Sequence, residues 1–447
     1  MHAALITRNT IQMKRQPKTL GLWTLTALVS GNMIGSGIFL LPSTLAKIGS
    51  ISLLAWAFTA LGAFCLALVF AKLSTLVRKS GGPYAYAEAG FGKFVGFQTA
   101  YNYWIAVWVG NAAIAIAVIG YLTIFFPILS TPLIGCLFAI AMLWILTLIN
   151  LTGLQAAGTL QIVMTILKFI PIFLVAIFGW WYFHPEFLTH NFNVTPFSNL
   201  SVFSHAIPLT LWAFIGMESA TIPAENVVNP KFNIPMATLL GTLIAAVAYI
   251  ASATVIMGMI PMPILALSIS PFAAAANIMF GHWGSWLIAL GAVISCFGCL
   301  NGWILVQAQI PMAAADDNLF PKIFGERNKA GVPAKGIIIT SICVTLLLLM
   351  TTNPDLNQEF QTIISIAVIA SLVAYFYTAI AEIILLKKQA HPVKPSHKIH
   401  IILALAAAIY SFWAIAGSAK NIVFYELLLL LSSIPLYSWE YWQKKSN

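Results

Sequence analysis

Two ionisable side chains, Lys168 and Glu218, lie deep inside apolar segments of this sequence. Charges in apolar surroundings are costly, so such residues usually bind a substrate or move a proton. Lys168 lies about 12 residues into its segment, which in a helix rising 1.5 Å per residue is a depth of ~18 Å. Pro171 lacks an N–H group and leaves the carbonyl of Leu167 free as a partner for the ammonium. We expect Lys168 and Glu218 to serve proton coupling; a packing role in a salt bridge is the alternative for Lys168.

Small and polar residues interrupt two apolar segments. Residues 30–37 contain three glycines, each of which costs a helix about 1 kcal/mol relative to alanine. Residues 212–219 contain another glycine and the carboxylate of Glu218. A broken helix in lipid releases N–H and C=O groups that need partners, and paired breaks mark the substrate site of inverted-repeat transporters. We expect a zwitterionic amino acid here, with its carboxylate at the N–H groups of Ser36 and Gly37; close packing of small residues is the alternative.

Motifs of catalysis or metal binding do not occur in the sequence. The eight His residues lie in tails, connections or segment ends, and no H-E-x-x-H, G-x-S-x-G or Walker A pattern occurs. Cys296 and Cys299 form a C-x-x-C, but without a second pair or clustered His we assign them to packing. We expect neither an enzyme nor a metal or other cofactor. A channel, which would usually show rings of repeated polar residues, is the weaker alternative of another class.

Composition identifies the elements around these residues as membrane-spanning helices. Of the 447 residues, 60% are apolar and 8% charged, against roughly 25% charged in a soluble domain. Each crossing needs ~20 apolar residues, which leaves no room for a folded soluble domain. We predict an all-α polytopic membrane protein with about 12 transmembrane helices, at residues 21–44, 51–77, 94–124, 131–150, 156–183, 204–223, 234–260, 282–314, 336–351, 359–387, 399–418 and 421–440.

Positive charges are distributed unevenly along the predicted membrane domain. The 22 Lys and Arg against 12 Asp and Glu give a net charge of +10, and most of the positive residues lie in the N-terminal tail, in every second connection and at the C-terminus. The positive-inside rule then places both termini in the cytoplasm, so the charge orients the protein and does not indicate nucleic acid. We predict a cytoplasmic tail at 1–20, a transporter core at 21–387, and two C-terminal transmembrane helices with a short tail at 388–447.

Six motifs resemble the amino acid/polyamine/organocation (APC) superfamily. They are G-N-M-I-G-S-G-I-F-L-L-P (31–42), S-G-G-P-Y-A-Y (80–86), Y-W-I-A-V-W-V-G-N (103–111), L-W-A-F-I-G-M-E-S-A (211–220), G-W-I-L-V-Q-A-Q (302–309) and A-A-A-D-D-N-L-F-P (313–321). Within the superfamily the chain is most similar to the basic amino acid/polyamine antiporters, and among them to the bacterial arginine/agmatine antiporters. The resemblance implies a LeuT-like fold, in which two inverted five-helix repeats with broken helices 1 and 6 precede two C-terminal helices. It also implies a homodimer in the bacterial inner (plasma) membrane.

The resemblance assigns a substrate site to residues of the two interruptions and of the helices around them. These are Met33, Ser36, Gly37, Ala106, Asn111, Trp212, Ile215, Trp303 and Ala367. Ser36 and Gly37 would bind the substrate carboxylate. Backbone carbonyls of Met33, Trp212 and Ile215 would surround the α-ammonium group.

The far end of the substrate would meet other residues of this set. Trp303 would stack on the cationic head group, a contact worth ~2 kcal/mol when desolvated, and would also act as a middle gate. Asn111 and the carbonyl of Ala106 would contact the same head group. A periplasmic gate would consist of Tyr103, Glu218 and Tyr375. For Tyr103 and Trp212, packing between helices is the alternative.

The sequence departs from the arginine/agmatine antiporters around the head group. Four positions carry different and mostly more apolar side chains: Val107, Ile114, Cys299 and Ala367. Arginine as the substrate is therefore in doubt. Lys168 replaces an uncharged residue, and proton-coupled members of the superfamily carry a lysine here. Two modes of alternating access stay open: exchange of an amino acid, arginine or another basic or polar one, for its decarboxylated amine, and proton-coupled amino acid uptake.

Overall fold

The computed structural model describes residues 20–77, 79–350, 355–389 and 395–446, so the predicted tail at 1–20 lies outside it except for its last residue. Over these residues the chain folds as a bundle of α-helices. Long apolar segments form helices because a helix satisfies its own backbone N–H and C=O groups where no water is present. The predicted all-α fold is confirmed.

The α-helices are α1 (Leu22–Met33), α2 (Ser36–Ala46), α3 (Ile51–Leu76), α4 (Pro83–Phe91), α5 (Lys93–Leu122), α6 (Pro132–Leu151), α7 (Leu154–Phe178), α8 (Pro185–Thr189), α9 (Asn199–Leu211), α10 (Pro230–Met259), α11 (Met262–Leu265), α12 (Pro271–Asp316), α13 (Ala334–Met350), α14 (Leu356–Gln389), α15 (Pro395–Ala416) and α16 (Lys420–Ser446). Within the described residues, nine helical spans are long and apolar enough to cross a membrane, one of them made of α1 and α2 together. Shorter apolar helices at Leu167–Tyr182 and Ala334–Met350 correspond to the fifth and ninth predicted spans. The sixth predicted span is α9 with the irregular residues after it.

Some boundaries differ from the prediction. α12 begins at Pro271 rather than at residue 282, but it bends at Gly281, whose φ of 71° is not helical. The predicted start therefore coincides with the helix beyond the bend. α9 begins at Asn199, before the predicted start at 204, because the side chain of Ser198 caps it. The short helix α4 has no counterpart among the predicted segments and begins at Pro83, a residue type favoured in the first turn of a helix.

The first span is broken between α1 and α2. α1 ends at Met33 and α2 begins at Ser36, and Ile34 and Gly35 between them are not helical. A Cβ atom on Gly35 would lie 2.3 Å from Sγ of Cys299. Glycine at this position therefore lets the break pack directly against α12.

The sixth span is broken after α9. The helix ends at Leu211, and the 3₁₀ turns η3 (Trp212–Phe214) and η4 (Ser219–Thr221) flank an irregular loop. Gly216 in this loop has a φ of 113°, which glycine adopts without strain, and a Cβ atom on it would lie 3.1 Å from the Trp303 ring. Both predicted helix breaks are thus confirmed.

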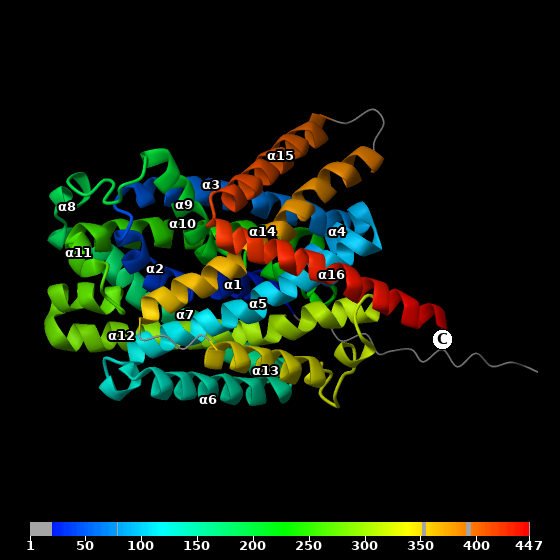
Figure 1. Ribbon diagram of the computed structural model, residues 1–447, viewed down its shortest axis with the longest axis horizontal. Coiled ribbons are helices and arrows are strands. Elements are labelled where there is room, and N and C mark those ends of the chain that lie inside the picture. Colours follow the sequence, from blue (N-terminus) through cyan, green and yellow to red (C-terminus); the bar gives the residue numbers. More distant parts are fainter. Residues whose placement is uncertain (1–19, 78, 351–354, 390–394, 447) are drawn as a thin grey trace, which may run out of the picture.

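The long helices run side by side along the long axis of the molecule (Figure 1). α8 and α11 lie at one end, and α4 lies at the other, where α16 also ends (Figure 1). This second end carries the start of α5 at Lys93 and the last turn of α14 with Lys387 and Lys388. We refer to it as the lysine-rich end; the positive-inside rule predicts that it is the cytoplasmic one.

Candidate functional site

The two helix breaks face one cavity of about 380 Å³, a volume that includes space open to solvent. Its lining comes from both breaks, α5, α12 and α14: Asn32, Met33, Gly35, Ser36, Gly37, Ala106, Val107, Gly110, Asn111, Ile114, Trp212, Ile215, Cys299, Trp303 and Ser371. Of the residues that the resemblance assigns to the substrate, all but Ala367 line the cavity. Ala367 lies behind Gly110, whose Cβ position is 4.0 Å from the Cβ atom of Ala367. Ser371, one helical turn further along α14, lines the cavity instead.

The backbone at the first break offers groups of both polarities. The N-terminus of α2 has no side-chain cap, so the N–H groups of Ser36 and Gly37 are available to a ligand, and the helix dipole favours an anion there. The carbonyl of Met33 accepts no hydrogen bond from the residues that the structure describes. A Cβ atom on Gly37 would lie 2.9 Å from the backbone of Ala213, so glycine lets the two breaks approach each other closely.

Two tryptophans are fixed against the breaks by hydrogen bonds. The indole N–H of Trp212 donates to Oγ of Ser36 at 3.2 Å, and that of Trp303 donates to the carbonyl of Asn32 at 3.0 Å. The side chain of Asn32 donates to Oγ of Ser219 at 2.9 Å and joins the first break to the second. Both rings therefore have defined positions at the cavity wall, where an aromatic face can meet a cation.

Lys168 binds the first break. Its fully buried ammonium donates to the carbonyls of Gly31 at 2.5 Å and Ile34 at 2.9 Å. The sequence pointed to the carbonyl of Leu167 as a partner, and this is wrong: the acceptors are carbonyls that the break has released. The salt bridge considered as an alternative is also absent, because no ion pair of Lys168 occurs among the described residues.

Glu218 holds two tyrosines next to the cavity. Its carboxylate accepts hydrogen bonds from the hydroxyl of Tyr103, from the hydroxyl of Tyr375 at 2.8 Å and from the N–H of Gly216 at 3.2 Å. All three side chains are fully buried. We call Tyr103, Glu218 and Tyr375 the carboxylate–tyrosine cluster.

The carboxylate–tyrosine cluster lies toward the lysine-rich end of the helices that line the cavity. Along α5, Tyr103 lies between Lys93 and the cavity residue Ala106, and along α14, Tyr375 lies between the cavity residue Ser371 and Lys387. The cluster therefore separates the cavity from the lysine-rich end. Two of our predictions disagree here: the positive-inside rule predicts that this end is cytoplasmic, whereas the resemblance implies a gate on the periplasmic side.

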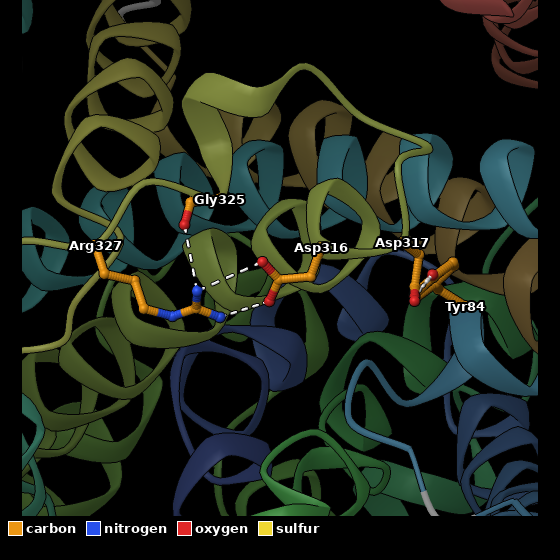
Figure 2. Close-up of polar contacts among 5 residues, drawn as sticks. All are labelled: Tyr84, Asp316, Asp317, Gly325 and Arg327. Atoms are coloured by element: carbon orange, nitrogen blue, oxygen red, sulfur yellow. Dashed lines mark hydrogen bonds and ion pairs between the residues drawn. The ribbon is translucent and has the colours of Figure 1, made fainter. Parts of the chain in front are cut away.

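A second polar layer lies beyond this cluster, at the lysine-rich end. Lys79 contacts Glu88 and Asp317, each at 2.6 Å, and the hydroxyl of Tyr84 on α4 donates to Asp317 at the end of α12 (Figure 2). Burial lowers the pKa of Lys79, but the two carboxylates raise it more, so the pKa is raised above its usual value. Burial and Asp317 raise the pKa of Tyr84 far above its usual value, so the hydroxyl stays protonated and donates. We call these four residues the inner-end network.

The neighbouring Asp316 makes a separate contact within its own segment. Arg327 donates to it at 2.5 Å and also reaches the carbonyl of Gly325 (Figure 2). The sequence reasoning missed both the inner-end network and this pair. The motifs at 80–86 and 313–321 contain three of these six residues, Tyr84, Asp316 and Asp317. Their partners could not be predicted, because only the fold brings the two segments together.

Metal binding has no support in the described part of the chain, where no group of three or more His, Cys, Asp or Glu could hold an ion.

Comparison with known proteins agrees with this arrangement. Residues 20–431 match the family described as amino acid permease. The chain is 33% identical over 435 residues to the cadaverine/lysine antiporter of Escherichia coli (strain K12), covering 96% of this chain and 97% of that protein. It is 36% identical over 418 residues to the putrescine transporter PotE of the same strain, covering 94% and 95%, and 35% identical over 426 residues to PotE of Haemophilus influenzae, covering 95% and 98%.

Proposed function

Because the chain belongs to the amino acid permease family, we propose that it is a secondary transporter that exchanges a basic amino acid for the diamine formed by its decarboxylation. The relatives named above are a cadaverine/lysine antiporter and putrescine transporters, which supports amines and basic amino acids as the substrate class. Such substrates carry an ammonium group at the end of an alkyl chain.

The observation that carries this proposal is the pair of helix breaks around one cavity. An amino acid would place its carboxylate at the N–H groups of Ser36 and Gly37 and its α-ammonium at the carbonyl of Met33. Trp212 and Ile215, on the second break, line the same cavity, and their carbonyls would also surround the α-ammonium. A diamine has the two ammonium groups of the basic amino acid but lacks its carboxylate. The same cavity could therefore bind the amino acid and the diamine alternately, as exchange requires.

The walls beyond the breaks favour an alkyl chain with a small cationic end. Val107, Ile114 and Cys299 line the cavity, and Ala367 leaves no polar group behind Gly110. The aromatic face of Trp303 and the amide of Asn111 are the groups suited to the far cation. Arginine stays a candidate substrate, but the small polar groups that a guanidinium would use are few, so we propose an ammonium-terminated substrate.

Alternating access would open and close the two ends of this cavity. At the lysine-rich end, the carboxylate–tyrosine cluster and the inner-end network would have to separate for release into the cytoplasm. Glu218 would act as a gate and as a proton-responsive group, because protonation would weaken its contacts with the tyrosines. Trp303 would be the gate directly at the substrate.

Counterflow in reconstituted vesicles tests the proposal. Uptake of labelled lysine or putrescine should require unlabelled lysine, putrescine or cadaverine inside the vesicles. Equal uptake into empty vesicles would contradict exchange.

Proton-coupled uptake is the second candidate, and the contacts of Lys168 favour it. Loss of a proton from this ammonium would weaken its hold on the carbonyls of Gly31 and Ile34, so protonation and the geometry of the first break would be linked. Uptake into empty vesicles that follows an imposed proton gradient would identify this mode.

The inverted repeat, a homodimer and a bacterial inner-membrane location with both termini cytoplasmic complete the proposal. Cysteine labelling from each side of intact vesicles would test the orientation. The mass of the purified protein in detergent would test the dimer.

A further inference from the structure

One buried acceptor in the cavity wall has no partner. Asn111 on α5 is fully buried and lines the cavity. Its Nδ2 donates to Oε1 of Gln307 on α12 at 2.6 Å, whereas its Oδ1 finds no hydrogen-bond partner among the described residues. A buried acceptor without a partner is unfavourable, so this oxygen is suited to a ligand that donates.

Gln307 decides which end of the Asn111 amide faces the cavity. Gln307 is itself buried but does not line the cavity. Its Nε2 donates to Oγ of Ser341 on α13 at 3.3 Å, and Ser341 is paired with Thr147 on α6 at 2.8 Å. The amide of Gln307 is thus bonded on both sides, and in the structure its oxygen faces Asn111 Nδ2.

The polarity of this chain of side chains has a chemical consequence. Because Gln307 Oε1 accepts from Asn111 Nδ2, the carbonyl oxygen of Asn111 faces the cavity, where a cationic group can donate to it. With both amides reversed, the NH₂ group of Asn111 would face the cavity, and an ammonium group cannot accept a hydrogen bond from it. The same residues in the opposite orientation would thus favour a different substrate.

We propose that Gln307 is a positioning residue that holds Asn111 with its carbonyl oxygen toward the cavity, and that this oxygen selects substrates whose far end is a primary ammonium. The inference rests on the proposed function and adds to it the atom of Asn111 that recognises the second cation of a diamine and the residue that orients it. Gln307 acts through Asn111 and does not touch the substrate.

Binding to the purified full-length protein, measured by calorimetry, tests the inference. The probes are putrescine and cadaverine, each compared with the monoamine of the same length, n-butylamine or n-pentylamine. We expect the wild-type protein to prefer at least one diamine over its monoamine by about tenfold or more, because a site built to bond a group rejects the analogue without it. Gln307→Met should reduce this ratio to below about threefold while leaving monoamine affinity within about twofold.

Two variants separate positioning from a structural role. Gln307→Glu keeps an oxygen opposite Asn111 Nδ2 and should retain the preference. Gln98→Met is the matched control, because Gln98 is also a buried glutamine on a helix, bonded to Ser433 at 3.0 Å, but it does not line or support the cavity. It should retain the wild-type ratio.

Each outcome of these measurements supports or overturns the positioning role of Gln307. An unchanged ratio in Gln307→Met, or an equal loss for diamine and monoamine, overturns the positioning role while the proposed function stands. If Gln307→Met does not fold, Ser341→Ala, which frees the Gln307 amide to turn, must lower the ratio in the same direction, or the inference is overturned. A folded wild-type protein that binds neither amine overturns the proposed function and this inference with it.

Discussion

Replacing Lys168 by methionine should weaken substrate binding by about 30-fold or more. Methionine fills a similar volume but removes both hydrogen bonds of the ammonium, to Gly31 at 2.5 Å and to Ile34 at 2.9 Å. A buried acceptor left without its donor costs about 1–3 kcal/mol. The two carbonyls together therefore disfavour the broken conformation by about 2–6 kcal/mol.

This penalty affects binding because the backbone groups of Ser36 and Met33 are available to the substrate only in the broken conformation. If the break is disfavoured, the apparent affinity falls by the fraction of molecules that keep it. The lower bound of about 2 kcal/mol corresponds to about 30-fold. Calorimetric titration of the purified protein with putrescine or lysine measures this ratio.

Matched variants isolate the cause. Lys168→Gln retains two N–H donors without a charge and should recover most of the affinity. Lys335→Met makes the same change at an exposed ion pair with Glu326 and should leave binding unchanged. Wild-type affinity in a folded Lys168→Met protein would refute the reasoning. Loss of binding in Lys168→Gln to the same degree would show that the charge, and not the donors, supports the break.

Three further predictions concern the gates, measured as exchange in reconstituted vesicles. Trp303→Ala should greatly reduce turnover, because it removes the ring at the substrate, whereas Trp303→Phe should retain part of it; equal rates for wild type and Trp303→Ala would contradict this role. Glu218→Ala should change the pH profile of exchange, since the carboxylate that holds the two tyrosines is gone, and an unaltered profile would exclude proton response through it. Lys79→Met should speed release at the lysine-rich end without changing that profile. The raised pKa of Lys79 keeps its ammonium charged below its usual ~10.5, and the charge is lost only as pH rises through the raised value. A profile that shifts between about pH 5 and 9 in Lys79→Met would contradict that assignment.

The spans and both helix breaks could be predicted because their signals are local. Long apolar runs and three glycines within residues 30–37 act on the segment that contains them. The cavity residues followed from the resemblance, since both breaks and their neighbours keep the quoted motifs. Local reasoning failed where partners come from elsewhere in the chain: Lys168 reaches past its own helix to the carbonyls of Gly31 and Ile34.

The position of the carboxylate–tyrosine cluster relative to the lysines could also be predicted from the sequence. Tyr103 is nearer than Asn111 to Lys93 along the same helix, and the direction of that helix follows from the charges. Gln307 gave a weaker signal, because it is one of two glutamines in the motif at 302–309 and nothing in the sequence distinguishes it from the other. Its role depends on Ser341 and Asn111 from two other helices, and only the packed structure brings these together.

The first break has one more consequence, for the ions that can drive this protein. Unwound backbone of this kind coordinates sodium in other transporters through several carbonyl oxygens at once. Here the oxygens of Gly31 and Ile34 are bonded to Lys168, and that of Asn32 to Trp303 and Cys299. The ammonium of Lys168 already occupies carbonyl oxygens that a sodium ion would need. Transport should therefore proceed at the same rate when choline replaces all external sodium.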